Sequence, residues 1–114
     1  MGGMDVPTCS VSGVPDPLPD GLLVLDVRDD DEWAAGHVDG SVHVPLMELD
    51  ARYAGLPAAE QTLVVCRVGS RSAYATAFLR QHGVEAVNLD GGLAAWERAG
   101  RPLVTDGGGA ATVI

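Results

Sequence analysis

Short apolar runs alternate along the chain with longer segments in which apolar residues recur at helical spacing. The runs are too short for helices and are rich in leucine and valine, so they predict buried strands. These strands are expected over residues 22–25, 42–44, 62–65 and 85–89. The remaining segments predict helices over about residues 30–35, 46–54, 72–82 and 92–99.

The alternation of strands and helices predicts an α/β fold with a mostly parallel central sheet that helices cover on both faces. Residues 8–12 are expected to add a short edge strand, which gives about five strands in all. Residues 8–104 then form one domain. It lies between a disordered segment over residues 1–7 and a flexible tail over residues 105–114, which holds three consecutive glycines.

One helix start carries a clear local signal. Asp29 is a natural N-cap, and Glu32 follows three residues later, which is the spacing of a capping box. Gly36 is expected to end this short helix, because glycine readily adopts the backbone conformation of a helix end.

The carboxyl ends of parallel strands share one edge of a sheet, and α/β folds bind ligands beyond that edge. We therefore expect four residues from separate strand ends at a common rim, namely Asp26, Pro45, Cys66 and Asp90. The glycines at positions 91 and 92 are expected to form an open lip near the cysteine.

The cysteine at this rim stands between a predicted strand and a predicted helix, and Arg67, Gly69 and Arg71 follow it. The first N–H groups of a helix lack partners, and successive loop amides can bind an anion. Together with two guanidinium groups, this setting favours the thiolate of a residue that ordinarily titrates near about 8.5. We therefore predict that Cys66 is ionised near neutral pH and acts as a nucleophile.

The same residues also have plainer interpretations. An isolated cysteine is more often a small core residue, and arginines are usually solvated surface charges. Asp26 either supports the site by bracing an arginine or a loop N–H, or caps the end of its strand. Arg28, the second supporting candidate, is expected to pair with nearby acids. His37 and His43 are expected to cap carbonyl groups or pack, rather than act as general bases.

Composition narrows the classes of partner. The 114 residues carry 16 acids against 7 bases, a net charge of −9, which argues against nucleic acid and anionic membranes as partners. The chain has no apolar run long enough to span a bilayer and no secretion signal that we recognise, so a cytoplasmic location is expected. The two arginines beside one cysteine are then a large share of the available positive charge.

Cysteine and histidine usage gives no sign of a disulfide framework or a metal site. The two cysteines are too few for a framework, and with the three histidines they show no ligand-like spacing. Cys9 is interpreted as a packing residue, with a resolving thiol for Cys66 as the alternative. We therefore expect no metal site.

Three blocks of sequence, in the expected order, resemble the signatures of the rhodanese-like domain family. The amino-terminal block comprises residues 25–28, 32–33, 36–41 and 44–45. Residues 66–72 resemble the active-site loop of the family, and residues 89–92, with Trp96 and Gly100, resemble its carboxyl-terminal signature. Together the blocks span about residues 22–103.

The resemblance implies a three-layer α/β sandwich and sulfur transfer through a persulfide on Cys66. The sulfur would come from thiosulfate or a persulfide donor and pass to a thiophilic acceptor such as cyanide or a thiol. No metal or organic cofactor would be needed, because the cysteine itself would carry the group. The family's loop residues would cradle the persulfide, with the two loop arginines attracting a small anionic donor. The loop positions are Arg67, Val68, Gly69, Ser70, Arg71 and Ser72.

Three other functions are weighed beside this one. A persulfide carrier would hand its sulfur to a sulfur-relay protein, and a binding module would use the fold without turnover, although such modules commonly lack the cysteine. A phosphatase or arsenate reductase would use the loop pattern Cys-X5-Arg, whereas only four residues separate Cys66 from Arg71 here. The shorter loop suits one sulfur atom better than a tetrahedral oxyanion.

Overall fold

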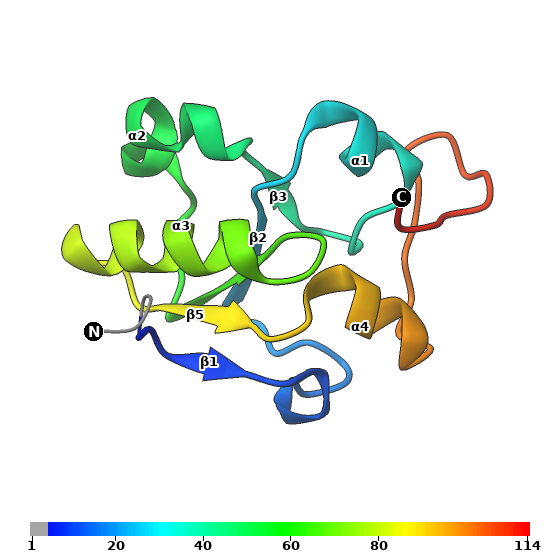
Figure 1. Ribbon diagram of the computed structural model, residues 1–114, viewed down its shortest axis with the longest axis horizontal. Helices are drawn as coiled ribbons and strands as arrows, with labels where there is room; N and C mark the ends of the chain where they lie inside the picture. The colour runs from blue at the N-terminus through cyan, green and yellow to red at the C-terminus, as the bar shows by residue number, and fades with distance from the viewer. Residues whose placement is uncertain (1–4) are drawn as a thin grey trace.

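The computed structural model describes residues 5–114 and contains a five-stranded sheet in the order β1-β5-β4-β2-β3. Every strand pair is parallel, which confirms the predicted α/β fold (Figure 1). The strands are β1 Thr8–Cys9, β2 Leu22–Asp26, β3 Val42–His43, β4 Gln61–Val65 and β5 Ala86–Leu89. Of the segment predicted to be disordered, residues 1–4 lie outside the described residues.

Over residues 5–114, four α-helices and three short 3-10 helices accompany the strands, and α4 follows the last strand (Figure 1). The α-helices are α1 Asp30–Ala35, α2 Leu49–Arg52, α3 Ser70–Gln81 and α4 Gly92–Arg98. The 3-10 helices are η1 Val11–Gly13, η2 Leu46–Glu48 and η3 Tyr53–Gly55. The single helix predicted over residues 46–54 is thus a broken series of η2, α2 and η3, and the helix predicted from residue 72 begins two residues earlier.

The capping box predicted for α1 is present. The Asp29 side chain accepts the N–H of Glu32, and Oε1 of Glu32 accepts the N–H of Asp29 over 3.1 Å. These two bonds satisfy two of the N–H groups that a helix start leaves without partners. The helix ends at Gly36, as predicted.

The core forms two layers, one on each face of the sheet. Along β4, alternate side chains enter opposite layers, as the two-residue period of a strand requires. Leu63 and Val65 pack in the layer that includes Trp96 of α4, whereas Val64 and Cys66 pack in the layer that includes Leu79 of α3. Both layers are buried, which explains why the strands read as continuous apolar runs.

The last residues of the chain return to α1, beside which the carboxyl terminus lies in Figure 1. The backbones of His37 and Val104 exchange two hydrogen bonds, and the N–H of Thr112 donates to the carbonyl oxygen of Ala35 over 2.9 Å. Hydrogen bonds therefore attach the tail to the domain at both ends, and its predicted flexibility stays a prediction.

Across residues 5–114, none of the helices reaches the length and apolarity that crossing a bilayer requires.

Candidate functional site

Cys66 lies directly after β4, the central strand of the sheet, and none of its surface is exposed. The first turn of α4 fastens the loop that begins there. The N–H of Leu93 donates to the Cys66 carbonyl oxygen over 2.8 Å, and the N–H of Ala94 donates to that of Arg67 over 2.9 Å. The unpaired donors of one helix start are thus used to fix the backbone of the cysteine loop.

Gly92 allows this close approach. A Cβ atom built on Gly92 would lie 2.5 Å from the Arg67 carbonyl oxygen, and its φ of 60° is one that glycine adopts without strain. The glycines predicted to form an open lip are therefore near the cysteine, but Gly92 is pressed against the loop rather than open to solvent.

Hydrogen bonds converge on the sulfur of Cys66. The N–H of Gly69 donates to Sγ over 3.1 Å, and the Ser72 hydroxyl lies 3.3 Å from Sγ. Burial raises the pKa of the Cys66 thiol, but the Ser72 hydroxyl and the N–H groups of Ser72, Gly69 and Val68 together bring the pKa below its ordinary value. Neither Arg67 nor Arg71 is among these main causes, so it is mainly the hydrogen-bond donors of the loop that favour the thiolate.

Asn88 of β5 joins this hydrogen-bond network. The Ser72 hydroxyl donates to Oδ1 of Asn88 over 2.5 Å, and Nδ2 of Asn88 donates to the carbonyl oxygen of Gly69 over 3.3 Å. Asn88 therefore positions both the Ser72 hydroxyl, which lies near Sγ, and the turn that precedes α3. We did not single out this residue from the sequence, although a buried amide among apolar strand residues at the sheet rim was an available signal.

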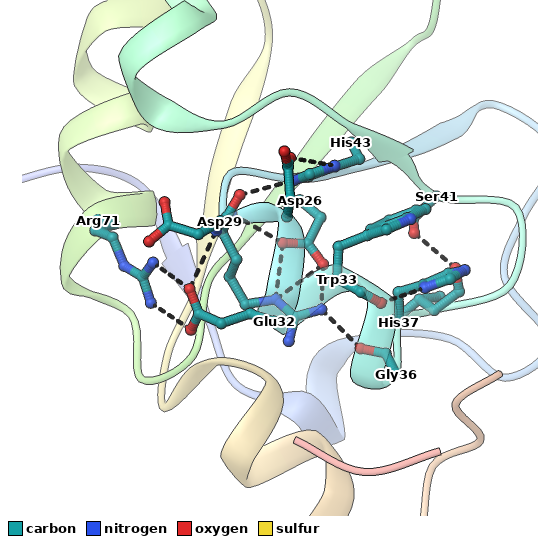
Figure 2. A network of polar contacts seen from close by, with 12 residues as sticks. Asp26, Asp29, Glu32, Trp33, Gly36, His37, Ser41, His43 and Arg71 are labelled. Carbon is teal, nitrogen blue, oxygen red and sulfur yellow. Dashed lines mark hydrogen bonds and ion pairs between the residues drawn. The ribbon is translucent and has the colours of Figure 1, made fainter. Parts of the chain in front are cut away.

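Arg71 forms a two-pronged ion pair with Glu32 of α1 (Figure 2). Nη1 and Nη2 of Arg71 lie 2.7 and 2.9 Å from Oε1 and Oε2 of Glu32. The Arg71 guanidinium, with help from the Asp29 N–H, lowers the pKa of Glu32 to about 2 despite partial burial, and the pKa of Arg71 is raised in turn. The arginine that the sequence assigned to an anionic donor is thus already paired with a carboxylate.

Asp26 and Arg28 form a second, fully buried ion pair beside the site. Nε and Nη2 of Arg28 donate to the Asp26 carboxylate, the shortest distance being 2.7 Å, and Nη2 also donates to the carbonyl oxygen of Gly36. Asp26 therefore braces an arginine, but that arginine is its near neighbour Arg28 and not one of the loop arginines. Arg28 pairs with a local acid, as its sequence position suggested.

The outer surface of the loop is formed by Arg67, Val68 and Ser70, which are exposed. The exposed fraction of Val68 is 52 %. Across residues 5–114, the Arg67 guanidinium makes no hydrogen bond or ion pair with the protein, so its charge is available to a ligand.

His37 and His43 have structural roles here, in agreement with the sequence interpretation. Nδ1 of His37 donates to the Trp33 carbonyl oxygen over 2.8 Å, and Nε2 of His43 donates to that of Arg28 over 2.7 Å. Both imidazole rings stack on the indole of Trp33, at centroid distances of 3.6 and 4.9 Å (Figure 2). The stack fixes α1 and the segment that follows it.

Comparison with known proteins identifies similar chains. The rhodanese-like domain family matches residues 13–99. A protein of Allochromatium vinosum named "Sulfurtransferase" is 35 % identical over 88 residues, which are 76 % of this chain and 82 % of that protein. The "Putative sulfur carrier protein YrkF" of Bacillus subtilis is 33 % identical over 76 residues, which are 66 % of this chain and 41 % of that protein.

A solved structure supports the same relationship. The crystal structure of a rhodanese-related protein from Thermoplasma volcanium superimposes with a TM-score of 0.81 at 30 % sequence identity. The match covers 88 % of this chain and 99 % of the other.

Proposed function

The chain belongs to the rhodanese-like domain family, and from this premise we propose that it is a sulfurtransferase that carries sulfane sulfur as a persulfide on Cys66. The observation that carries the proposal is the set of donors at Sγ: the Gly69 N–H at 3.1 Å, and the Ser72 hydroxyl at 3.3 Å, whose one proton is shared between Sγ and Oδ1 of Asn88. These groups favour a thiolate, which is the nucleophilic form of cysteine. A relative named as a sulfurtransferase supports the same class of reaction.

In the first half-reaction, the Cys66 thiolate attacks the sulfane sulfur of the donor. With thiosulfate, the new bond joins Sγ to the sulfane sulfur, the sulfur–sulfur bond of thiosulfate breaks, and its electron pair leaves with sulfite. With a persulfide donor, a thiolate leaves instead. In both cases Cys66 becomes a persulfide anion, without net oxidation.

The amides at the start of α3 suit this intermediate. The persulfide's negative charge resides mainly on its outer sulfur, and the loop N–H groups that already face Sγ are donors for that charge. The exposed Arg67 guanidinium is a further cation of the same loop. Because the loop backbone is fastened by α4, these donors need little rearrangement when the charge forms.

In the second half-reaction, a thiophilic acceptor attacks the outer sulfur. With cyanide, a carbon–sulfur bond forms, the persulfide bond breaks, and thiocyanate leaves as the Cys66 thiolate is restored. A thiolate acceptor is converted into a persulfide in the same way. The cysteine itself carries the group, so the proposed reaction requires no further cofactor.

A second candidate function is a persulfide carrier that serves one protein partner in a sulfur relay. The relative named as a sulfur carrier and the exposed Val68 on the outer surface of the loop favour this candidate. Either function requires a thiolate, which persists in a reducing cytoplasm, and we assign the protein to that compartment as part of the proposal.

The test is the intact mass of the protein after brief incubation with thiosulfate, for the wild type and for Cys66→Ala. We expect the wild type alone to gain one sulfur atom, and cyanide to remove it as thiocyanate. Equal adducts in both proteins would reject Cys66 as the carrier. Loading by a persulfide but not by thiosulfate would favour the relay carrier.

A further inference from the structure

We propose that Glu32 determines donor specificity: by occupying the guanidinium fork of Arg71, it makes the site prefer sulfur donors of low negative charge over dianionic thiosulfate. This inference rests on the proposed sulfur transfer and concerns the class of donor. It assigns a role to a residue on α1, 34 positions before the cysteine in the sequence.

The first observation is that the fork of Arg71 is filled. An arginine binds a carboxylate or sulfonate most strongly through two parallel N–H bonds, and Glu32 accepts both of them at 2.7 and 2.9 Å. A sulfonate that approached Arg71 would have to displace this carboxylate or use the weaker remaining N–H positions. The pair as a whole carries no net charge toward a donor.

The second observation is that Glu32 is held in place from its own helix. Its Oε1 also accepts the N–H of Asp29 in the capping box, and only 13 % of the side chain is exposed. Displacing Glu32 from Arg71 would therefore separate a charge pair and also disturb the start of α1. A small anionic donor gains too little to offset both losses.

The third observation is the charge around the pair. Carboxylate oxygens of Asp29, Asp31 and Glu32 lie within 4.8 Å of one another, so α1 presents a concentration of negative charge beside Arg71. Across residues 5–114, Arg67 is the loop arginine whose guanidinium has no hydrogen-bond or ion-pair partner. A dianion is repelled by the acids of α1 about twice as strongly as a monoanion at the same place, because Coulomb energy scales with charge.

Two sulfur donors that differ in charge isolate the effect of Glu32 on selectivity. Thiosulfate and methanethiosulfonate offer the same terminal sulfane sulfur, but the first is a dianion and the second a monoanion. Thiosulfate releases sulfite, whereas methanethiosulfonate releases methanesulfinate, and each leaves the same persulfide on Cys66. The ratio of kcat/KM for the two donors, measured with cyanide as acceptor, reports charge selectivity.

The variant is Glu32→Gln, which removes the charge while keeping an oxygen that can accept the Asp29 N–H, since glutamine also serves in a capping box. The matched control is Asp31→Asn, which removes one charge from the same helix at an exposed position that is not bonded to Arg71. Retained α1 structure is checked by the cooperative unfolding of both variants.

We expect the wild type to prefer methanethiosulfonate. Glu32→Gln should shift the ratio of kcat/KM toward thiosulfate by roughly five- to tenfold, because the charge of the nearby Arg71 guanidinium is then no longer neutralised. Asp31→Asn should shift it by less than about twofold because its carboxylate is solvated. An unchanged ratio in Glu32→Gln, with both donors still loading Cys66, would overturn the specificity role and leave sulfur transfer intact. Loading of the wild type by a persulfide but by neither of these donors would overturn this inference and leave sulfur transfer intact, whereas loading by no donor at all would overturn the proposed function as well.

Discussion

The N–H of Leu93 donates to the carbonyl oxygen of Cys66 over 2.8 Å, so the peptide group of the proposed nucleophile is bonded to the start of α4. This contact depends on Gly92, whose position leaves no room for a side chain. The shape of the cysteine loop is therefore set by a segment more than twenty residues away in the sequence.

The first prediction concerns Gly92→Ala. The added Cβ would lie 2.5–2.6 Å from backbone atoms of Cys66 and Arg67, so we expect a loss of at least about 2 kcal/mol in the free energy of unfolding and loss of sulfur loading. Gly100→Ala is the matched control. Its φ is also positive, at 75°, but nothing lies within 4 Å, so it should cost only about 1 kcal/mol and leave loading unchanged. Equal effects of the two variants in denaturant unfolding would contradict the steric explanation.

The second prediction concerns Cys66→Ser. The substitution is small, and the serine hydroxyl can use the same hydrogen-bond partners, so the free energy of unfolding should change by no more than about 2 kcal/mol. Sulfur loading, followed by intact mass, should be abolished because an alcohol is not ionised near neutral pH. Persistent loading of this variant would move the carrier to another residue, for which Cys9 is the first to examine.

The third prediction concerns Ser72→Ala. The Ser72 hydroxyl is the group that most strongly lowers the pKa of Cys66 against the effect of burial, so its removal should raise that pKa. In a Cys9→Ser background, the pH midpoint of iodoacetamide labelling should move upward. Ser70→Ala, an exposed change in the same turn of α3, should leave the midpoint in place. A midpoint that did not move in Ser72→Ala would assign the low pKa to the loop amides alone.

The fourth prediction concerns Arg71→Ala. This variant removes a cation and also leaves the Glu32 carboxylate without its partner, so kcat/KM for thiosulfate should fall more than that for methanethiosulfonate. The double variant Glu32→Gln, Arg71→Ala should restore part of the thiosulfate activity, because the unpaired carboxylate is then gone. Equal losses for both donors, with no restoration, would indicate collapse of the loop instead.

The fifth prediction concerns acid stability. The pKa of Glu32 is about 2 in the folded protein and about 4.3 in an unfolded chain. Ionised Glu32 therefore contributes stability that is fully present above about pH 5 and is lost as the pH falls through about 2. Urea unfolding should show Glu32→Gln to be less stable than the wild type at pH 6, with a smaller difference at pH 3. If the two proteins differed in stability by the same amount at both pH values, the ion pair with Arg71 would not be the source of that difference.

Features that depend on neighbours in the sequence could be predicted. The capping box of Asp29 and Glu32 spans four residues, and its residue types alone predict it. The strands were recognisable because burial on both faces of a parallel sheet requires continuous apolar runs. The placement of Cys66 between a strand and a helix followed from those two patterns.

Features that depend on tertiary pairing could not be predicted in this way. Arg71 and Glu32 are 39 positions apart, and nothing in the local sequence shows that the loop arginine meets that acid rather than solvent. Asn88 reaches Ser72 from a different strand. The helix predicted over residues 46–54 divides into three short segments, a division that apolar spacing alone does not show.

The position of β4 has a consequence for how the protein opens. β4 is paired on both sides, with β2 and β5, whereas the edge strands β1 and β3 are two residues long. Amide hydrogens of β4 should therefore exchange with solvent only when the whole domain unfolds, while those of the edges exchange through local fraying. Cys66 directly follows this strand, so partial opening at the edges of the sheet should leave its backbone support in place.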